Sequence, residues 1–283
     1  MGPDALFASL QGWAFAVALC VGSFMNVCIA RMPEDRSVVS PPSHCPACGH
    51  QIRWYENIPV LSWIALRARC SGCGSRISPL YPIIELLVGI LGLLLFRELV
   101  PGPEQVSVAS FAGWAFYLVF VAMLVGLSYI DLRHYIIPDQ FSVYAVPVGV
   151  AGAALLTHLG WDRAVTWQQS VVGALIGGGS LLLILGAWWL IRRQEGMGMG
   201  DVKLLAMIGA FLGAWPALFF VILASTLVGS AIGISVIVIK RSSLKTQLPF
   251  GPFLAVAALI YLFFGDSIIA HWLPGLMFAP TRL

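Results

Sequence analysis

The stretch Phe111–Ile130, FAGWAFYLVFVAMLVGLSYI, contains no charged residue and is followed directly by Asp131. A helix of this length is about 30 Å long, which matches the hydrocarbon thickness of a bilayer. Because lipid offers no hydrogen-bond partner to a peptide backbone, the stretch is expected to be an α-helix that crosses a membrane. The fold class depends on how often such stretches recur along the chain.

Seven further apolar blocks flank this one. They are Leu6–Ala30, Pro82–Phe96, Phe141–Leu156, Val171–Ile191, Val202–Leu212, Ala217–Ile239 and Phe253–Leu273. Of the 283 residues, 59% are hydrophobic and 10% are charged, whereas soluble domains carry roughly a quarter charged residues. The sequence therefore predicts an all-α polytopic membrane protein with about eight transmembrane helices. The block at 202–212 is short, which leaves open whether it crosses the whole bilayer.

The first block, Leu6–Ala30, is interpreted as a retained transmembrane anchor. A removable signal peptide begins with a positively charged region, but only the acidic Asp4 precedes this block, and Arg31 follows its far end. This charge order is expected for an anchor whose N-terminus lies outside the cytoplasm.

The Lys and Arg residues predict the orientation of the whole chain, because cytoplasmic loops of membrane proteins are enriched in them. With the N-terminus outside, twelve of the sixteen Lys and Arg residues fall in cytoplasmic connections and three fall in outer ones. The remaining one, Lys203, lies just within the start of a helix. The net charge is only +3, and the basic residues form no single long run. Nucleic-acid binding is therefore not expected.

One long polar insertion, Arg31–Tyr81, separates the first apolar block from the second. We divide the chain into a first transmembrane helix at residues 1–30, a cytoplasmic cysteine-rich loop at residues 31–81 and a membrane domain at residues 82–283. The loop holds two Cys-x-x-Cys pairs, Cys45/Cys48 and Cys70/Cys73, with 21 residues between them. Four thiolates at this spacing predict a structural, tetrahedral Zn²⁺ site. The alternative is a reduced redox pair or unligated thiols, because the cytoplasm disfavours stable disulfides.

Two aspartates are the main catalytic candidates. Asp131 ends the third apolar block and Asp201 begins the sixth, so both lie at the cytoplasmic edge in the predicted topology. Ionisable residues at such places usually face a bundle interior or a wet cavity and are functional. Two carboxylates brought together share a proton, because desolvation and repulsion raise the pKa of one of them. That is the arrangement of an aspartyl peptidase.

Other roles for the acidic residues remain open at this point. Asp201 follows Gly196, Gly198 and Gly200, which are expected to permit positive φ and a close approach to a peptide substrate, but it can also simply cap a helix. Asp139 is interpreted as a helix cap in a turn. Glu85 either lines the same polar cavity as the aspartates or favours a helix N-terminus.

Several short motifs follow one another along the chain: Gly22–Val27, Arg31–Pro33, the two cysteine pairs, Asn57–Pro59, Ser62–Trp63, Ile77–Ser78, Tyr81–Pro82, Asp131–Leu132, Ile137–Asp139, Gly198–Asp201 with Lys203, and Pro249–Pro252. As an ordered set they resemble the bacterial type IV prepilin peptidases, also called prepilin leader peptidase/N-methyltransferases, which are GxGD-type aspartyl membrane peptidases. Ala68 departs from the pattern, since glycine is expected at its position.

The resemblance implies cleavage after a glycine at the end of a short basic leader on type IV prepilins and type II secretion pseudopilins. It implies Asp131 and Asp201 as the catalytic pair, the bacterial cytoplasmic (inner) membrane as the location and its cytoplasmic face as the place of the chemistry. N-methylation of the new N-terminal residue with S-adenosylmethionine is implied by resemblance alone. Two other readings are an ion-coupled membrane transporter with an intramembrane aspartate pair and a structural subunit of a secretion assembly.

Overall fold

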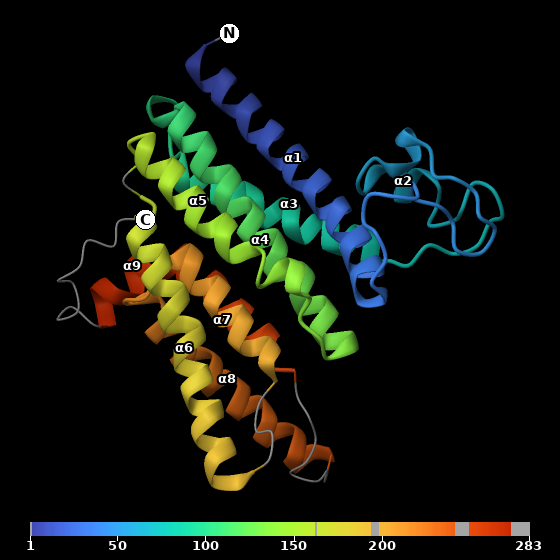
Figure 1. Ribbon diagram of the computed structural model, residues 1–283. Helices are drawn as coiled ribbons and strands as arrows, with labels where there is room; N and C mark the ends of the chain where they lie inside the picture. The colour runs from blue at the N-terminus through green and yellow to red at the C-terminus, as the bar shows by residue number, and fades with distance from the viewer. Residues whose placement is uncertain (1, 162, 194–197, 241–248, 273–283) are drawn as a thin grey trace. The chain divides into compact units, whose positions relative to one another are not determined.

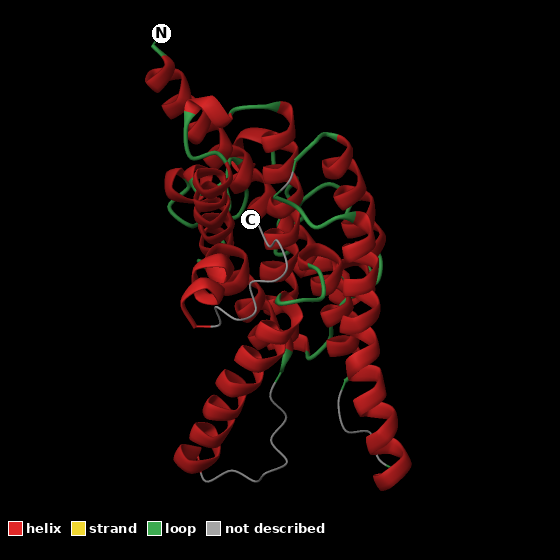
Figure 2. Cartoon of the chain, turned by 90° about the vertical axis from the view of Figure 1, so that its left-hand side faces the viewer, coloured by secondary structure: helices red, strands yellow, loops and turns green. Residues whose placement is uncertain are grey.

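The computed structural model describes residues 2–161, 163–193, 198–240 and 249–272, which form helices joined by loops (Figure 1). The α-helices are α1 Pro3–Arg31, α2 Leu61–Ala65, α3 Leu80–Leu99, α4 Val108–His134, α5 Ala145–His158, α6 Trp167–Arg192, α7 Met199–Leu212, α8 Ala217–Lys240 and α9 Gly251–Trp272. Short 3₁₀ turns lie at Met32–Glu34, Trp54–Asn57, Pro103–Gln105 and Asp139–Phe141. The described residues contain isolated β-bridges but no strand (Figure 2).

The predicted all-α membrane fold is confirmed, and each of the eight apolar blocks overlaps a helix within the described residues; Leu273, at the end of the last block, lies outside them. Six helices within the described ranges are long and apolar enough to cross a membrane: α1, α3, α4, α6, α8 and the segment Asp139–His158 that contains α5. At 14 residues, α7 is about 21 Å long and is shorter than the hydrocarbon core. The apolar part of α9, Gly251–Gly265, is also shorter than the others.

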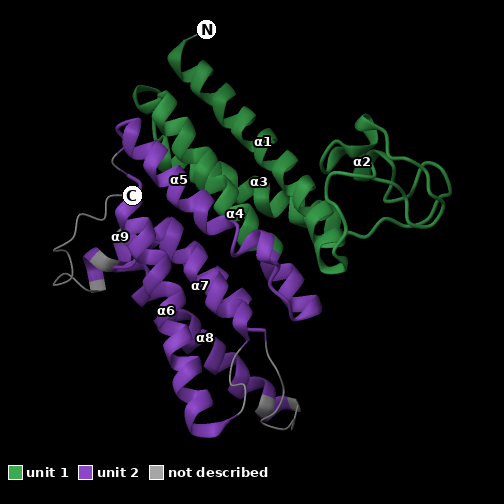
Figure 3. Cartoon of the chain, viewed as in Figure 1, with its two compact units in different colours: residues 1–126 green, residues 127–283 purple. Residues whose placement is uncertain are grey.

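The chain divides into two compact units, residues 1–126 and residues 127–283, with the boundary inside α4 (Figure 3). The first unit contains α1, the cysteine-rich loop, α3 and most of α4. The second contains the end of α4 and helices α5 to α9, and therefore both candidate aspartates.

In the first unit, α1 and α3 pack closely because glycines remove the side chains between them. A Cβ atom at Gly22 would lie 2.8 Å from the Cα atom of Glu85, and one at Gly92 would overlap the side chain of Ala18. The indole N–H of Trp114 on α4 donates to the Gly92 carbonyl oxygen over 2.9 Å. The buried indole N–H is thereby satisfied inside the helix bundle.

In the second unit, α7 is the central element and contacts α5, α6, α8 and α9. Nearly all of its side chains from Val202 to Leu212 are buried. Its closest neighbour is α6, because a Cβ atom at Gly173, Gly177 or Gly209 would overlap the backbone of the facing helix. A mostly apolar helix that is surrounded by others is held by its burial rather than by its length. This packing fixes the direction in which the first turn of α7, with Asp201, points.

Candidate active site and candidate metal centre

Asp131 lies in the last turn of α4 and is held by a backbone group from a distant part of the chain. Its side chain is buried, with 5% exposed. The backbone N–H of Gly251, the first residue of α9, donates to its Oδ2 atom over 3.1 Å. A Cβ atom at position 251 would lie 2.6 Å from the same oxygen. Only glycine therefore allows the backbone to approach this carboxylate so closely.

Asp201 lies in the first turn of α7, near Asp131. The negative charge of Asp131 acts on the Asp201 carboxyl group. Asp201 does not cap the helix, because Gly198 is the N-cap residue and makes no side-chain bond. The backbone N–H of Asp201 instead donates to the Gly198 carbonyl over 3.2 Å. The structure thus brings together the carboxyl groups of Asp131 and Asp201, two residues that are 70 positions apart in the sequence.

Ile137 packs between the start of α7, which carries Asp201, and the start of α9, which contacts Asp131. A Cβ atom at Gly200 would lie 3.1 Å from Ile137 Cβ, and one at Gly251 would lie 3.2 Å from Ile137 Cδ1. The expectation of positive φ before Asp201 is wrong for Gly198, which has a φ of −70°, and for Gly200, which is helical; Gly196 lies outside the described residues. Gly200 instead allows close packing against Ile137, since an added Cβ atom would make a tight contact there.

Asp139 and Lys203 form an ion pair beside this site, with 2.6 Å between Nζ and Oδ1. The interpretation of the Asp139 side chain as a helix cap is wrong, because its carbonyl oxygen, not its carboxylate, accepts the Ser142 and Tyr144 N–H groups. Lys203 lies two residues after Asp201 on α7. The pair therefore ties the turn after α4 to the helix that carries the second candidate aspartate.

The four predicted metal ligands form a cluster. The Sγ atoms of Cys45, Cys48, Cys70 and Cys73 all lie within 4.8 Å of one another, and those of Cys45 and Cys73 are 3.9 Å apart. Four sulfurs around one tetrahedral Zn²⁺ at 2.3 Å would be about 3.8 Å apart. The donor set and its spacing therefore fit a metal ion.

The two cysteine pairs adopt the same backbone structure. The Cys45 N–H donates to the His50 carbonyl and the Gly49 N–H donates to the Cys45 carbonyl, over 2.8 and 2.9 Å. Cys70, Gly74 and Ser75 repeat this pattern in the second pair. Gly49 and Gly74 have φ values of 72° and 71°, which glycine adopts without strain. Each cysteine pair, with the glycine that follows it, thus forms a tight turn; these two turns, Cys45–His50 and Cys70–Ser75, are called knuckles below.

Ser75 is a polar neighbour of the cluster that the spacing of the cysteines did not reveal. Its Oγ lies 3.2 Å from the Sγ of Cys73 and 3.6 Å from that of Cys45. The Ser75 hydroxyl is the main cause that lowers the pKa of the Cys45 thiol to about 6. Metal binding requires thiolates, so a hydroxyl at this position favours the liganding form of the cluster.

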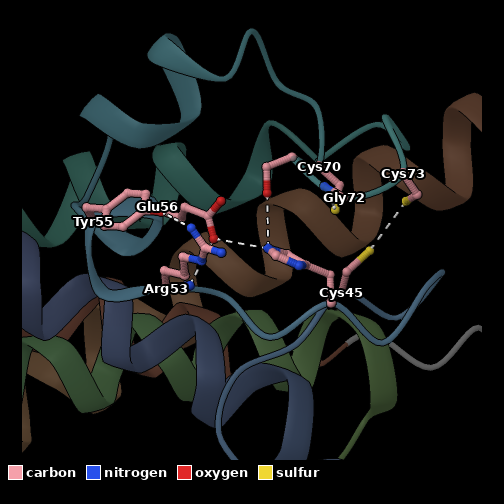
Figure 4. A network of polar contacts seen from close by, with 9 residues as sticks. Cys45, Arg53, Tyr55, Glu56, Cys70, Gly72 and Cys73 are labelled. Carbon is pink, nitrogen blue, oxygen red and sulfur yellow. Dashed lines mark hydrogen bonds and ion pairs between the residues drawn. The ribbon is translucent and has the colours of Figure 1, made fainter.

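A polar network connects the knuckles to the segment between them (Figure 4). The Glu56 Oε2 atom accepts the Arg53 N–H over 2.9 Å and lies 3.2 Å from His50 Nε2. His50 Nε2 is also 3.1 Å from the Ser71 hydroxyl. Hydrogen bonding, led by that of Ser71, lowers the pKa of Glu56 to about 2. One carboxylate therefore links the first knuckle, the second knuckle and the Trp54–Asn57 turn.

Glu85 joins the loop to the helices of the first unit. It is buried in α3, with 7% exposed, and its Oε2 atom accepts the Val60 N–H over 2.8 Å. Val60 has a φ of 63°, an uncommon conformation for a β-branched residue. Ala68, where glycine was expected, has a φ of 57°; the departure from the pattern therefore places alanine in a left-handed conformation that glycine adopts more easily.

Comparison with known proteins matches both units. The family described as "Bacterial Peptidase A24 N-terminal domain" matches residues 16–99, and the "Type IV leader peptidase family" matches residues 118–234. No solved structure matches the chain.

Several similar proteins are named "Prepilin leader peptidase/N-methyltransferase". That of Aeromonas hydrophila is 38% identical over 92% of both chains, and that of Stutzerimonas stutzeri is 32% identical over 92% of both. That of Myxococcus xanthus (strain DK1622) is 44% identical over 78% of this chain, a match that spans 61% of the relative.

Proposed function

Because the chain belongs to the type IV leader peptidase family, we propose that it removes a short basic leader, after a glycine, from type IV prepilins and type II secretion pseudopilins. Family membership and the names of the relatives make it a peptidase with N-methyltransferase activity that processes prepilins in a membrane. The proposal adds the cleavage position, the residues that act and the side of the membrane on which they act.

Asp131 and Asp201 are the proposed catalytic pair, and the Gly251 hydrogen bond supports a division of their roles. A donated N–H stabilises the ionised form of a carboxylate, and Asp131 is the aspartate that accepts one. Asp131 then takes a proton from the attacking water, while the protonated Asp201 donates to the scissile carbonyl oxygen. The peptide bond breaks through a tetrahedral intermediate without a covalent acyl-enzyme.

The substrate enters laterally from the bilayer, with its basic leader left in the cytoplasm. A helical peptide hides its carbonyl groups in hydrogen bonds, so the substrate helix must unwind near the cleavage site. The predicted orientation, with the N-terminus of the chain outside, puts the ends of α4 and α7 that carry the aspartates at the cytoplasmic face of the inner membrane. The Lys and Arg distribution supports this orientation.

The metal of the cysteine cluster is proposed to be Zn²⁺ with a structural role. Four thiolates complete its coordination and leave no open position for a substrate. When bound, the ion would hold the two knuckles together. S-Adenosylmethionine is the proposed methyl donor for the second activity.

The dyad is tested by replacing either aspartate with asparagine, which keeps the shape but removes the titrating group. Cleavage of a prepilin in membranes should fall by about a hundredfold to ten-thousandfold, which is the range of a general acid–base contribution. Asp4→Asn, on an exposed residue in the first turn of α1, is the control and should cleave normally. Retained cleavage by Asp131→Asn or Asp201→Asn would remove that residue from the dyad.

A further inference from the structure

The first unit contains an open groove along one face of α1. Its volume is about 330 Å³, and it is lined by the α1 residues Cys20, Phe24, Val27 and Arg31. Asn57 and Pro59 of the cysteine-rich loop form part of the opposite wall. Residues spaced by three and four positions share a helix face, so the groove follows α1 for about 16 Å. Neither aspartate belongs to this unit.

On the α1 side, the lining passes from mostly apolar residues, Cys20, Phe24 and Val27 with Ser23 among them, to the charged Arg31. The loop adds apolar surface from Val38, Val39, Pro41 and Pro42. Phe24 and Val27 are hydrocarbon, and Phe24 is 49% exposed, as expected for a side chain that faces lipid or an apolar ligand. Towards the end of α1, Arg31 and Asn57 supply a positive charge and an amide group. An occupant should therefore have an apolar part at membrane depth and a polar end at the cytoplasmic surface.

The walls of the groove are built from specific contacts. The two Nη atoms of Arg31 donate to the carbonyl oxygens of Ser37 and Pro42 over 3.0 and 3.4 Å, which holds one wall segment against α1. The other wall is held by Glu85, through the Val60 N–H next to Pro59. Because both walls are fixed to the helices, binding requires little ordering of the chain.

We propose that this groove binds the new N-terminal end of the cleaved substrate, an apolar membrane segment with a free α-amine, for N-methylation. The inference rests on the proposed function, because that cleavage creates such a segment. The volume lies at the lower end of the range of small-molecule pockets, about 300 to 1,000 Å³, which is room for the end of a peptide but not for a whole helix. The apolar first side chain lies against Phe24 and Val27, and the amine lies near Asn57.

The chemistry of the transfer is consistent with this placement. The lone pair of the amine attacks the methyl carbon of S-adenosylmethionine, and a nitrogen–carbon bond forms as the sulfur–carbon bond breaks. The electron pair of the broken bond neutralises the sulfonium, and the amine proton passes to water.

The test uses the full chain in lipid vesicles and a synthetic peptide that matches the cleaved substrate, with photoreactive benzoylphenylalanine as its first residue. Irradiation without S-adenosylmethionine should attach the peptide to α1 near Phe24 and Val27 or to the facing loop segment. Val27→Trp fills the groove and should reduce both the attachment and the rate of methylation by about tenfold or more, a loss of about 1.4 kcal/mol in binding.

Ile90→Trp, on an exposed face of α3 in the same unit, is the matched control. It should change neither the attachment of the peptide nor the rate of methylation. Leader cleavage by each variant, which the groove does not perform, reports whether the variant is folded. Attachment elsewhere in the chain, attachment only to lipid, or unchanged attachment in Val27→Trp would overturn the inference. If the unaltered chain fails to cleave a full-length substrate, the proposed function itself is wrong, so the two failures are distinguishable.

Discussion

At the scale of single residues, the candidate active site depends on close approaches that only small side chains permit. Gly251 brings a backbone N–H to Asp131, and Gly200 allows Ile137 to pack beside Asp201. A carboxylate in a buried place needs such a partner, because an unpaired buried charge is costly. The residues next to the aspartates therefore determine whether the pair has the right geometry.

Gly251→Ala should reduce prepilin cleavage by about a hundredfold, the effect of displacing a catalytic group by about 1 Å. The added Cβ atom would lie 2.6 Å from Asp131 Oδ2, so the carboxylate or the start of α9 must move. The measurement is kcat and KM for a prepilin in detergent, and kcat should carry most of the loss. Gly179→Ala, where a Cβ atom meets nothing within 4 Å, should behave as the parent chain. Full activity of Gly251→Ala would show that this contact does not position Asp131.

Glu56 makes the stability of the loop depend on pH. Its pKa is lowered from the ordinary value of 4.5 to about 2 in the folded chain. A group with a lowered pKa stabilises the fold above its unfolded pKa, and this contribution is lost as pH falls through the folded value. Glu56→Gln should therefore unfold at a lower temperature than the parent chain near neutral pH.

The difference in melting temperature between the two chains should shrink between about pH 4.5 and pH 2, where the parent carboxylate becomes protonated. Because the comparison is made at each pH, effects of acid on the cysteine cluster occur in both chains and cancel. A difference that stayed constant down to pH 2 would contradict a role for the ionised carboxylate.

At the scale of elements, the cysteine-rich loop has almost no helix of its own and is organised by its two knuckles. Within its described residues it forms 3₁₀ turns, the five-residue helix α2 and two isolated bridges. A segment with so few buried apolar side chains needs another source of stability, and four clustered thiols can supply it by binding a metal.

Purified protein should contain about one Zn²⁺ per chain, and Cys70→Ser should lose it. The loop should then be cleaved by a soluble protease much faster than in the parent chain, because the knuckles are no longer connected. Metal analysis and the rate of proteolysis at Arg67 or Arg69 measure the two effects. Cys28→Ala, which removes a thiol of α1 outside the cluster, should keep the metal. Less than a stoichiometric amount of zinc in the parent chain would argue against the site.

At the scale of the whole molecule, two compact units correspond broadly to two matched families: the match at residues 16–99 lies within the first unit, and the match at residues 118–234 lies mostly within the second. The aspartate pair and its supporting contacts lie in the second unit, whereas the cysteine cluster and the groove lie in the first. Cleavage and methylation are therefore proposed to use different parts of the chain. This separation is why variants of one unit are informative controls for the other.

The amino-acid sequence by itself determined the helical membrane fold, because long apolar blocks have a single way to satisfy their backbone in lipid. It also determined the cysteine cluster, because four ligands at knuckle spacing are a local pattern. Only the tertiary structure decided the contacts of Gly251 with Asp131, of Lys203 with Asp139 and of Glu85 with Val60. Each joins residues 25 to 120 positions apart, and no local pattern specifies which distant groups the packing of helices brings together.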